Sequence, residues 1–236
     1  MPPLPSSYGE SRKALHRVAV YVLWPARTAA DGRIRLRPMP GGFGFGPAGD
    51  PTASVRVEGL DLVVERGDEV RRTALTSISA AAEFAGVAPG VELAAAHDVP
   101  APGDLDAQLG IDTNGALALA EWFAFAGDVL GSLHQEARPA DVPSDEVVLW
   151  PEHFDCAFEQ GREDDGKRAS YGISPGDRNS DEPYLYVAPW VAPPDDPFWN
   201  ADGFGGRWLK RSELGPDATA QALEFFRQAR ERLLGV

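Results

Sequence analysis

The residues whose types and spacing could do chemistry lie in the C-terminal half of the chain, in the stretch Leu-Trp-Pro-Glu-His-Phe-Asp-Cys at 149–156. His153 and Asp155 are two positions apart, and residues at that spacing share one face of a β-strand. An imidazole beside a carboxylate can act as a general base with its orienting partner, or can bind a divalent metal. The stretch therefore predicts His153 and Asp155 as a catalytic pair.

A metal site would need further ligands beyond this pair. Carboxylates follow in two turns further along the chain, and they could supply oxygen ligands from neighbouring strands. The candidate ligands are His153, Asp155, Asp177 and Glu182. A divalent metal is therefore the expected cofactor if the site is catalytic. The structural alternative is that His153 hydrogen-bonds Asp155 or a backbone carbonyl at the end of a strand.

Two nearby residues resemble nucleophiles but are disfavoured as such. Strand alternation places Cys156 in an apolar row with Phe154 and Phe158, which predicts a small core residue. Ser174 is the centre of a Gly-x-Ser-x-Gly pattern at 172–176. The hydrolase elbow with that pattern needs a helix directly after the serine, whereas Pro-Gly-Asp predicts a turn that leads into another strand.

The segment 190–208 is irregular and rich in aromatic residues and glycine. Aromatic side chains in such a loop can stack on a sugar or base ring and close over it, or they can pin the loop to the core. We predict a pocket between this segment and the sheet, with Trp190, Trp199, Phe204 and Tyr184 as ligand-binding residues. Small-molecule binding is therefore the favoured function. The alternatives are a metal-dependent or acid–base enzyme of hydrolase type, and an interaction or structural protein without a small ligand.

The elements that must position these residues belong to an α+β fold. Hairpin-length connections favour mostly antiparallel sheets, and apolar residues spaced by three and four predict a long central helix at 112–136. A second helix is expected from Asp217 or Thr219 to Gly235, and a short one at 76–84. Expected strands are 18–22, 34–39, 54–57, 60–65, 69–75, 147–150, 154–159, 167–173 and 184–188. Residues 41–46, which alternate glycine with phenylalanine, are predicted as a flexible loop.

The domain organisation is predicted from composition. Residues 1–10 are rich in proline and serine and are expected to be disordered. Residues 11–236 are expected to form a single domain, with strand-rich subdomains at 11–86 and 147–236 bridged by the helix 112–136 as an alternative. The letters Val-Leu-Trp-Pro occur at 22–25 and again at 148–151, which raises an internal duplication as a hypothesis.

Charge and cysteine content restrict the partners. The 36 acidic and 22 basic residues give a formal charge of −14, and the basic residues do not cluster, so no nucleic-acid partner is expected. No uninterrupted apolar run reaches the ~20 residues of a spanning helix, so no membrane partner is expected. A single cysteine fits a reducing compartment, and the predicted location is the cytoplasm. The sequence does not determine the oligomeric state.

Several motifs together carry a family resemblance. They are Leu-Trp-Pro-Glu-His-Phe-Asp at 149–155, Tyr-Gly-x-Ser-Pro-Gly-Asp at 171–177 and Glu-Pro-Tyr-Leu-Tyr-Val-x-Pro-Trp at 182–190, with further matching letters at 32–44, 55–59, 197–200 and 204–206. From about Leu15 onwards the chain is similar to a family of uncharacterised bacterial proteins. The resemblance implies a free-standing soluble protein, and it implies no reaction, ligand or catalytic residue.

Overall fold

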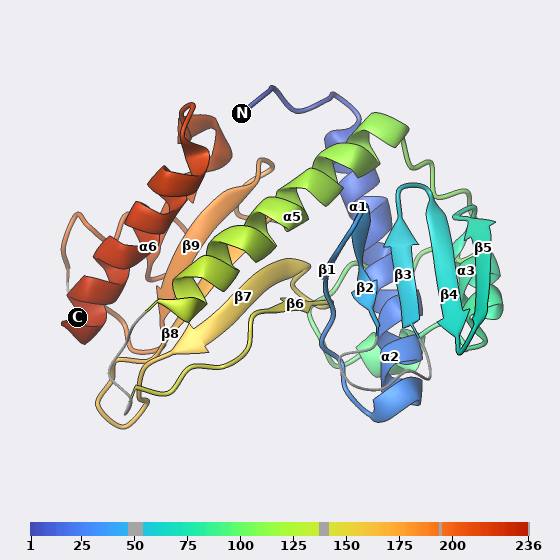
Figure 1. Ribbon diagram of the computed structural model, residues 1–236, viewed down its shortest axis with the longest axis horizontal. Helices are drawn as coiled ribbons and strands as arrows, with labels where there is room; N and C mark the ends of the chain where they lie inside the picture. The colour runs from blue at the N-terminus through green and yellow to red at the C-terminus, as the bar shows by residue number, and fades with distance from the viewer. Residues whose placement is uncertain (47–53, 137–141, 194, 236) are drawn as a thin grey trace. The chain divides into compact units, whose positions relative to one another are not determined.

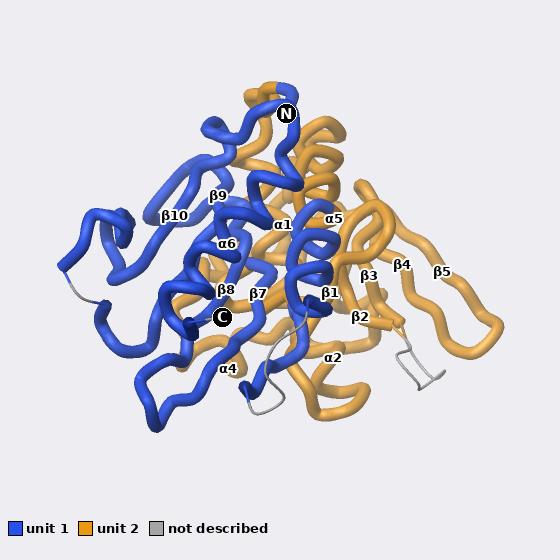
Figure 2. Tube along the Cα trace, turned by 60° about the vertical axis from the view of Figure 1, so that its left-hand side comes forward, with its two compact units in different colours: residues 1–2, 125–148, 155–236 blue, residues 3–124, 149–154 orange. Residues whose placement is uncertain are grey.

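The computed structural model describes residues 1–46, 54–136, 142–193 and 195–235. It shows two antiparallel sheets, a long helix α5 (Thr113–Gln135) and a C-terminal helix α6 (Ala218–Leu234), which confirms the predicted α+β class (Figure 1). The chain divides into two compact units (Figure 2). Unit 1 comprises residues 1–2, 125–148 and 155–236, and unit 2 comprises residues 3–124 and 149–154.

Unit 2 contains a five-stranded antiparallel meander in which each strand pairs with its neighbour in the chain. The strands are β1 (Arg37–Met39), β2 (Gly42–Phe45), β3 (Ser54–Glu58), β4 (Asp61–Arg66) and β5 (Glu69–Ala74). The three predicted strands at 54–57, 60–65 and 69–75 are therefore confirmed within one or two residues. Between β1 and β2 the left-handed Gly41 makes the turn.

Strand β2 corrects the prediction of a flexible loop at 41–46. Gly42 and Gly44 are glycines because β3 passes close to them: a Cβ at either position would collide with a carbonyl oxygen of β3. Phe43 and Phe45 point to the opposite face and are almost fully buried. The alternation of glycine and phenylalanine is thus the pattern of a strand that has no room for side chains on one face.

The helices of unit 2 begin with one continuous helical segment. It consists of α1 (Tyr8–Val18), the π-helix η1 (Ala19–Leu23) and α2 (Trp24–Asp31), which ends at the left-handed Gly32. The predicted strand at 18–22 is therefore wrong. Every residue from Val18 to Leu23 is at most 1% exposed, and a helix buried on all sides has no helical periodicity in its sequence. Residues 8–10 of the predicted disordered tail are helical.

Two shorter helices complete unit 2. They are α3 (Ile78–Ala85) and α4 (Val91–Ala94). The prediction for 76–84 is confirmed together with its ends, because the Ser77 side chain accepts a hydrogen bond from the amide of Ala80 and Gly86 is left-handed. The long connection after α4 contacts the first helix through Tyr21, whose hydroxyl donates to the carbonyl of Pro100 at 2.5 Å.

The structure also answers the duplication hypothesis. Residues 22–25 lie in the junction of η1 and α2, whereas residues 148–150 form strand β6 (Val148–Trp150) and residue 151 lies in a turn. Two copies of a duplicated element would keep one secondary structure. The repeated letters are therefore a chance match.

The second sheet is also five-stranded and antiparallel, in the order β10-β9-β8-β7-β6. Its strands in unit 1 are β7 (Asp155–Gln160), β8 (Ala169–Ser174), β9 (Tyr184–Pro189) and β10 (Arg207–Lys210), and the last two residues of β6 count with unit 2. The predicted strands at 147–150, 154–159, 167–173 and 184–188 are confirmed. The sequence did not predict β10, nor the short 3-10 helix η2 (Arg211–Glu213) that follows it.

The register of this sheet gives its two faces different characters. Cys156, Phe158 and Tyr171 share a fully buried apolar face. Helix α6 packs on that face, where Tyr171 meets Phe226 at 6.4 Å between ring centroids, and so does the end of α5, where His134 meets Phe158 at 5.5 Å. The opposite face carries polar and aromatic side chains from all four strands, and it is the subject of the next section.

Helix α5 is long and apolar enough to cross a membrane, judged by length and composition alone. It carries the charged residues Glu121 and Asp128, and half of its most apolar 18-residue window is buried inside the protein. These properties fit the core helix of a soluble protein. The α6 prediction is confirmed at both ends, with Asp217 accepting from the amide of Ala220 and with a left-handed Gly235.

Candidate functional site

The predicted pair of His153 and Asp155 is separated by a break in the backbone. Phe154 has a φ of 56°, which is the left-handed region, and β7 begins only at Asp155. His153 lies in the preceding turn and is exposed, whereas Asp155 is 5% exposed. The strand alternation that predicted a shared face therefore does not extend to His153. The two residues also fall in different compact units.

The turn 151–154 is held within unit 2 by His16 of helix α1. The Nε2 atom of His16 lies 3.1 Å from the carbonyl oxygen of Pro151 and 3.2 Å from that of Glu152. Its ring stacks on Phe154 with centroids 4.8 Å apart and planes at 5°. Burial lowers the pKa of His16 to about 4, so at neutral pH the ring is uncharged and its Nε2–H donates to the carbonyls.

Phe154 also packs edge-on against Phe43, with centroids 5.1 Å apart, and against Phe123, at 5.2 Å. These contacts, together with His16, stabilise a left-handed backbone that is strained for a residue with a side chain. The Pro-Glu-His-Phe part of the motif thus has a structural role in unit 2. The sequence offered no signal for His16, because it lies about 135 residues away from the turn that it anchors.

Asp155 faces a tyrosine on the polar face of the unit 1 sheet. The hydroxyl of Tyr186 donates a hydrogen bond to Oδ2 of Asp155. Burial, and then the charge of Asp155, raise the pKa of Tyr186 well above its ordinary value, so the phenol stays protonated and is a donor. The ring of Tyr186 lies directly over Gly172, its partner on β8, where any Cβ would overlap the ring.

A second tyrosine and aspartate pair lies beside the first. The hydroxyl of Tyr184 donates to Oδ2 of Asp177 at 2.6 Å. Asp177 also accepts from the backbone amides of Asn179, at 2.7 Å, and Ser180, at 3.3 Å. Burial, and then Asp177, raise the pKa of Tyr184. Both phenols are therefore held in place by a carboxylate.

These two tyrosines belong to a closed circuit of four aromatic rings, which we call the aromatic circuit: Tyr184, Tyr186, Phe204 and Trp208. Neighbouring centroids around it are 6.0 Å (184 to 186), 6.2 Å (186 to 204), 6.1 Å (204 to 208) and 5.6 Å (208 to 184) apart. Trp208 stands opposite Tyr186 across the β9–β10 pair. Phe204 lies against Gly206, where a Cβ would be 2.6 Å from its ring.

The predicted ligand-binding residues divide between this circuit and its surroundings. Tyr184 and Phe204 belong to it. Trp199 packs edge-on against Phe198 with centroids 4.9 Å apart, and Trp190, which is 48% exposed, lies under the guanidinium of Arg168 at 4.7 Å. The prediction did not include Tyr186 and Trp208 as site residues. The alternation Tyr-x-Tyr on β9 indicated that Tyr186 shares a face with Tyr184. Trp208 could not be identified in this way, because strand β10 was not predicted.

The four predicted metal ligands do not form a ligand set in the structure. In the described parts of the chain, no group of three or more His, Cys, Asp or Glu side chains is placed to hold a metal ion. Asp155 and Asp177 accept from tyrosines, as described above. Oε2 of Glu182 accepts from the backbone amide of Ser212 at 3.1 Å.

The two nucleophile-like residues behave as expected from the sequence. Cys156 is fully buried on the apolar face, and burial, with a smaller effect of Asp155, raises the pKa of its thiol well above the usual value. Ser174 ends β8, and its Oγ accepts from the amide of Gly176 at 3.1 Å. Residues 175–183 form an irregular turn that leads into β9, so Ser174 lacks the helix that a nucleophile elbow requires.

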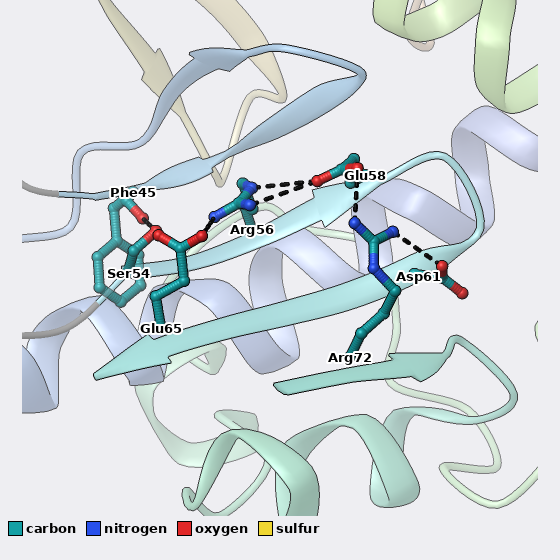
Figure 3. Close-up of polar contacts among 7 residues, drawn as sticks. All are labelled: Phe45, Ser54, Arg56, Glu58, Asp61, Glu65 and Arg72. Carbon is teal, nitrogen blue, oxygen red and sulfur yellow. Dashed lines mark hydrogen bonds and ion pairs between the residues drawn. The ribbon is translucent and has the colours of Figure 1, made fainter. Parts of the chain in front are cut away.

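The sheet of unit 2 carries a different kind of polar face (Figure 3). Arg56 contacts Glu65 at 2.7 Å and Glu58 at 3.4 Å, and Arg72 contacts Glu58 at 2.6 Å and Asp61 at 2.9 Å. Charges of opposite sign thus alternate across three adjacent strands. We call this face self-neutralised because each of the five charges has a partner of opposite sign, although the carboxylates outnumber the arginines by three to two.

No protein-family model, curated protein or solved structure matches this chain. The fold and the site define an α+β protein whose second sheet bears an aromatic circuit with two carboxylate-bound phenols. The functional argument therefore rests on the geometry of that circuit.

Proposed function

We propose that the protein binds a small organic molecule at the aromatic circuit of unit 1. The observation that carries this proposal is the closed set of four rings on one sheet face, joined to two aspartates through phenol hydrogen bonds. Ligand sites combine aromatic surface with a few fixed polar groups. Tyr186, Phe204 and Trp208 are half-buried residues, whereas Tyr184 is buried.

The polar groups of the circuit are preorganised for binding. Tyr186 is fixed by Gly172 beneath its ring and by Asp155 at its hydroxyl. The hydroxyl of Tyr184 is fixed in the same way by Asp177. A phenol that donates a hydrogen bond to a carboxylate still has oxygen lone pairs that can accept from a ligand. Because these side chains are already ordered, a ligand loses less free energy to ordering them.

A thermal-shift screen against a broad library of metabolite-like compounds tests this proposal. Compounds that raise the melting temperature of the wild type should raise it much less in Phe204→Ala. The matched control is Trp190→Ala, which removes an aromatic ring from the same segment but outside the circuit. A screen without a single stabilising compound, or stabilisation that survives Phe204→Ala in full, would overturn the proposal.

The other functional hypotheses stay predictions. For the metal-dependent or acid–base enzyme, stoichiometric zinc or manganese in the purified protein, lost in His153→Ala, would support it. For an interaction protein, an unresponsive screen would be the first indication. We further propose that the protein is bacterial and cytoplasmic and has no nucleic-acid or membrane partner. Its acidic composition supports the absence of a nucleic-acid partner, and its single, buried cysteine supports the cytoplasm.

A further inference from the structure

We infer that the protein forms a homodimer through strand β5 of unit 2, in which two copies of the strand pair antiparallel across a twofold axis. β5 is the last strand of its sheet (Figure 1), and all of its residues except Thr73 are exposed. An edge strand offers N–H and C=O groups to another strand unless a proline, a bulge or charged side chains protect it. The inference does not depend on the aromatic circuit, which lies in unit 1.

The hydrogen-bonding pattern shows which backbone groups of β5 face outwards. Directly after the strand, the amide of Leu75 donates to the carbonyl of Leu60 at 2.8 Å. Hydrogen-bonded pairs alternate with non-bonded pairs along an antiparallel ladder, so every second residue back from Leu75 bonds to β4. The residues whose N–H and C=O groups point away from β4 are Val70, Arg72 and Ala74.

The arginines of β5 do not protect this edge, because their side chains lie over their own unit. The guanidinium of Arg72 contacts Glu58 on β3 at 2.6 Å. That of Arg71 lies 4.8 Å from the centre of the Phe84 ring on α3 and donates to the backbone carbonyl of Phe84 at 3.2 Å. Val70 is 62% exposed, the highest value among the large apolar side chains that the structure describes. The edge therefore presents an apolar side chain and an accessible backbone.

The order of charges along β5 selects one register for a symmetric pair. Outward-facing residues must stand opposite outward-facing residues, so the twofold axis passes through one of the positions 69–74. An axis at 69, 71 or 72 places two glutamates or two arginines directly opposite each other, which is destabilising. An axis at 73 or 74 requires the outer side of Thr76, whose carbonyl already accepts from the amide of Leu109 at 2.9 Å.

An axis at Val70 brings opposite charges together. Glu69 then stands opposite Arg71 of the second copy, and Asp68 opposite Arg72 of the second copy. Val70 exchanges both backbone hydrogen bonds with its own copy, and the two valine side chains cover each other on one face of the joined sheet. Because the pairing covers only positions 68–72, the interface is smaller than a standard one, and the dimer should be reversible.

Sedimentation equilibrium of the full-length protein over a roughly hundredfold range of concentration tests the inference. The wild type should show a monomer–dimer equilibrium. Glu69→Arg places arginines opposite each other and should weaken association at least about tenfold, because the symmetry repeats each like-charge pair. Exchanging the two charges, with Glu69→Arg and Arg71→Glu in one chain, should restore the wild-type constant. These side chains are 70% and 42% exposed, so the variants keep the fold.

The matched control is Glu92→Arg on helix α4, which changes the net charge by the same amount at another exposed position of unit 2. In so acidic a chain it reduces repulsion between copies, so association should stay unchanged or strengthen slightly. Val70→Pro removes an outward N–H that β4 does not use, which a sheet edge tolerates, and it should leave a folded monomer. A wild type that stays monomeric throughout, a dimer that survives Glu69→Arg, or equal weakening by Glu92→Arg would overturn the inference.

Discussion

The polar faces of the two sheets differ in the partners of their charged side chains. On the unit 2 sheet, Arg56 and Arg72 alternate with carboxylates of neighbouring strands, so each charge meets one of opposite sign (Figure 3). On the unit 1 sheet, Asp155 and Asp177 accept hydrogen bonds from phenols. A phenol satisfies one acceptor position of a carboxylate and brings no charge of its own.

The difference indicates which face serves a ligand. A self-neutralised face gains little from an incoming molecule, because binding would have to break ion pairs that are already satisfied. A face of fixed aromatic rings offers apolar surface that a ligand can still contact. Four predictions test or sharpen this comparison, in order of decreasing effect.

The largest effect is expected from Gly172→Ala in the unit 1 sheet. The new Cβ would overlap the ring of Tyr186, and overpacking of this kind costs about 3 kcal/mol. Urea unfolding should show the loss, and ligand binding at the aromatic circuit should disappear with the displaced ring. The control is Gly131→Ala, in the same unit, where nothing lies within 4 Å of the added carbon. The free energy of unfolding of that variant should rise by up to ~1 kcal/mol, because alanine favours the helix. Equal stability of the two variants would contradict this packing.

The second effect is a pH dependence of stability that His16 brings to unit 2. Its pKa falls from 6.5 to about 4 on folding, mainly through burial. Between these values the unfolded chain binds the proton and the folded chain does not, so stability is fully present above pH 6.5 and is lost as the pH falls towards 4. A pKa change of this size corresponds to about 3 kcal/mol, which the partial exposure of the ring reduces to about 2 kcal/mol.

Urea unfolding at pH 7 and pH 4.5 measures this effect in the wild type and in His16→Gln, which keeps an amide donor but cannot titrate. The variant should lose less stability than the wild type between the two values. An identical loss in both proteins would show that His16 is not the residue responsible.

The third effect compares the two phenols. Tyr186→Phe removes one donor from Asp155, which is only 5% exposed, and the expected cost is about 1.5 kcal/mol. Tyr184→Phe should cost less, about 0.5 kcal/mol, because Asp177 is only half-buried and keeps the amides of Asn179 and Ser180. Thermal unfolding of both variants measures the difference. A larger loss of stability in Tyr184→Phe would show that Asp177 depends more on its phenol donor than Asp155 does.

The smallest effect is expected on the self-neutralised face. Arg72 has a side chain that is 46% exposed and forms ion pairs with Glu58 and Asp61. Arg72→Ala should therefore cost about 0.5 kcal/mol at low salt and nothing measurable in ~1 M salt, where such pairs are screened. A loss of several kcal/mol that salt does not change would mean that this face contributes to the core of unit 2.

Much of the fold could be predicted from local sequence, because local patterns specify strands with one buried face and helices with clear caps. Ser77 and Asp217 begin helices as predicted, and the strand at 184–188 follows its alternation. The prediction failed where burial on all sides or close strand packing removes the usual sequence pattern. The segment from Val18 to Leu23 is buried on every side and so shows no helical period, and β2 has glycine where a strand normally has polar residues.

The candidate site was predictable only in part. Tyr184 and Phe204 were identified from their aromatic surroundings, but their assembly with Trp208 depends on the pairing of β9 with β10, which no local pattern contains. The expected pairing of His153 with Asp155 depended on a regular strand through Phe154. The left-handed backbone at that residue is produced by packing within unit 2, so a single strand pattern could not reveal it.

The most direct test of the central claim is fluorine NMR on protein labelled with 5-fluorotryptophan. The chain has six tryptophans, and the resonance of Trp208 can be assigned from Trp208→Phe. On titration with a compound that raises the melting temperature, the Trp208 resonance should shift in a saturable way while that of Trp150, outside unit 1, stays in place. A stationary Trp208 resonance beside a shifting Trp150 or Trp24 resonance would place the ligand away from the aromatic circuit and contradict the account.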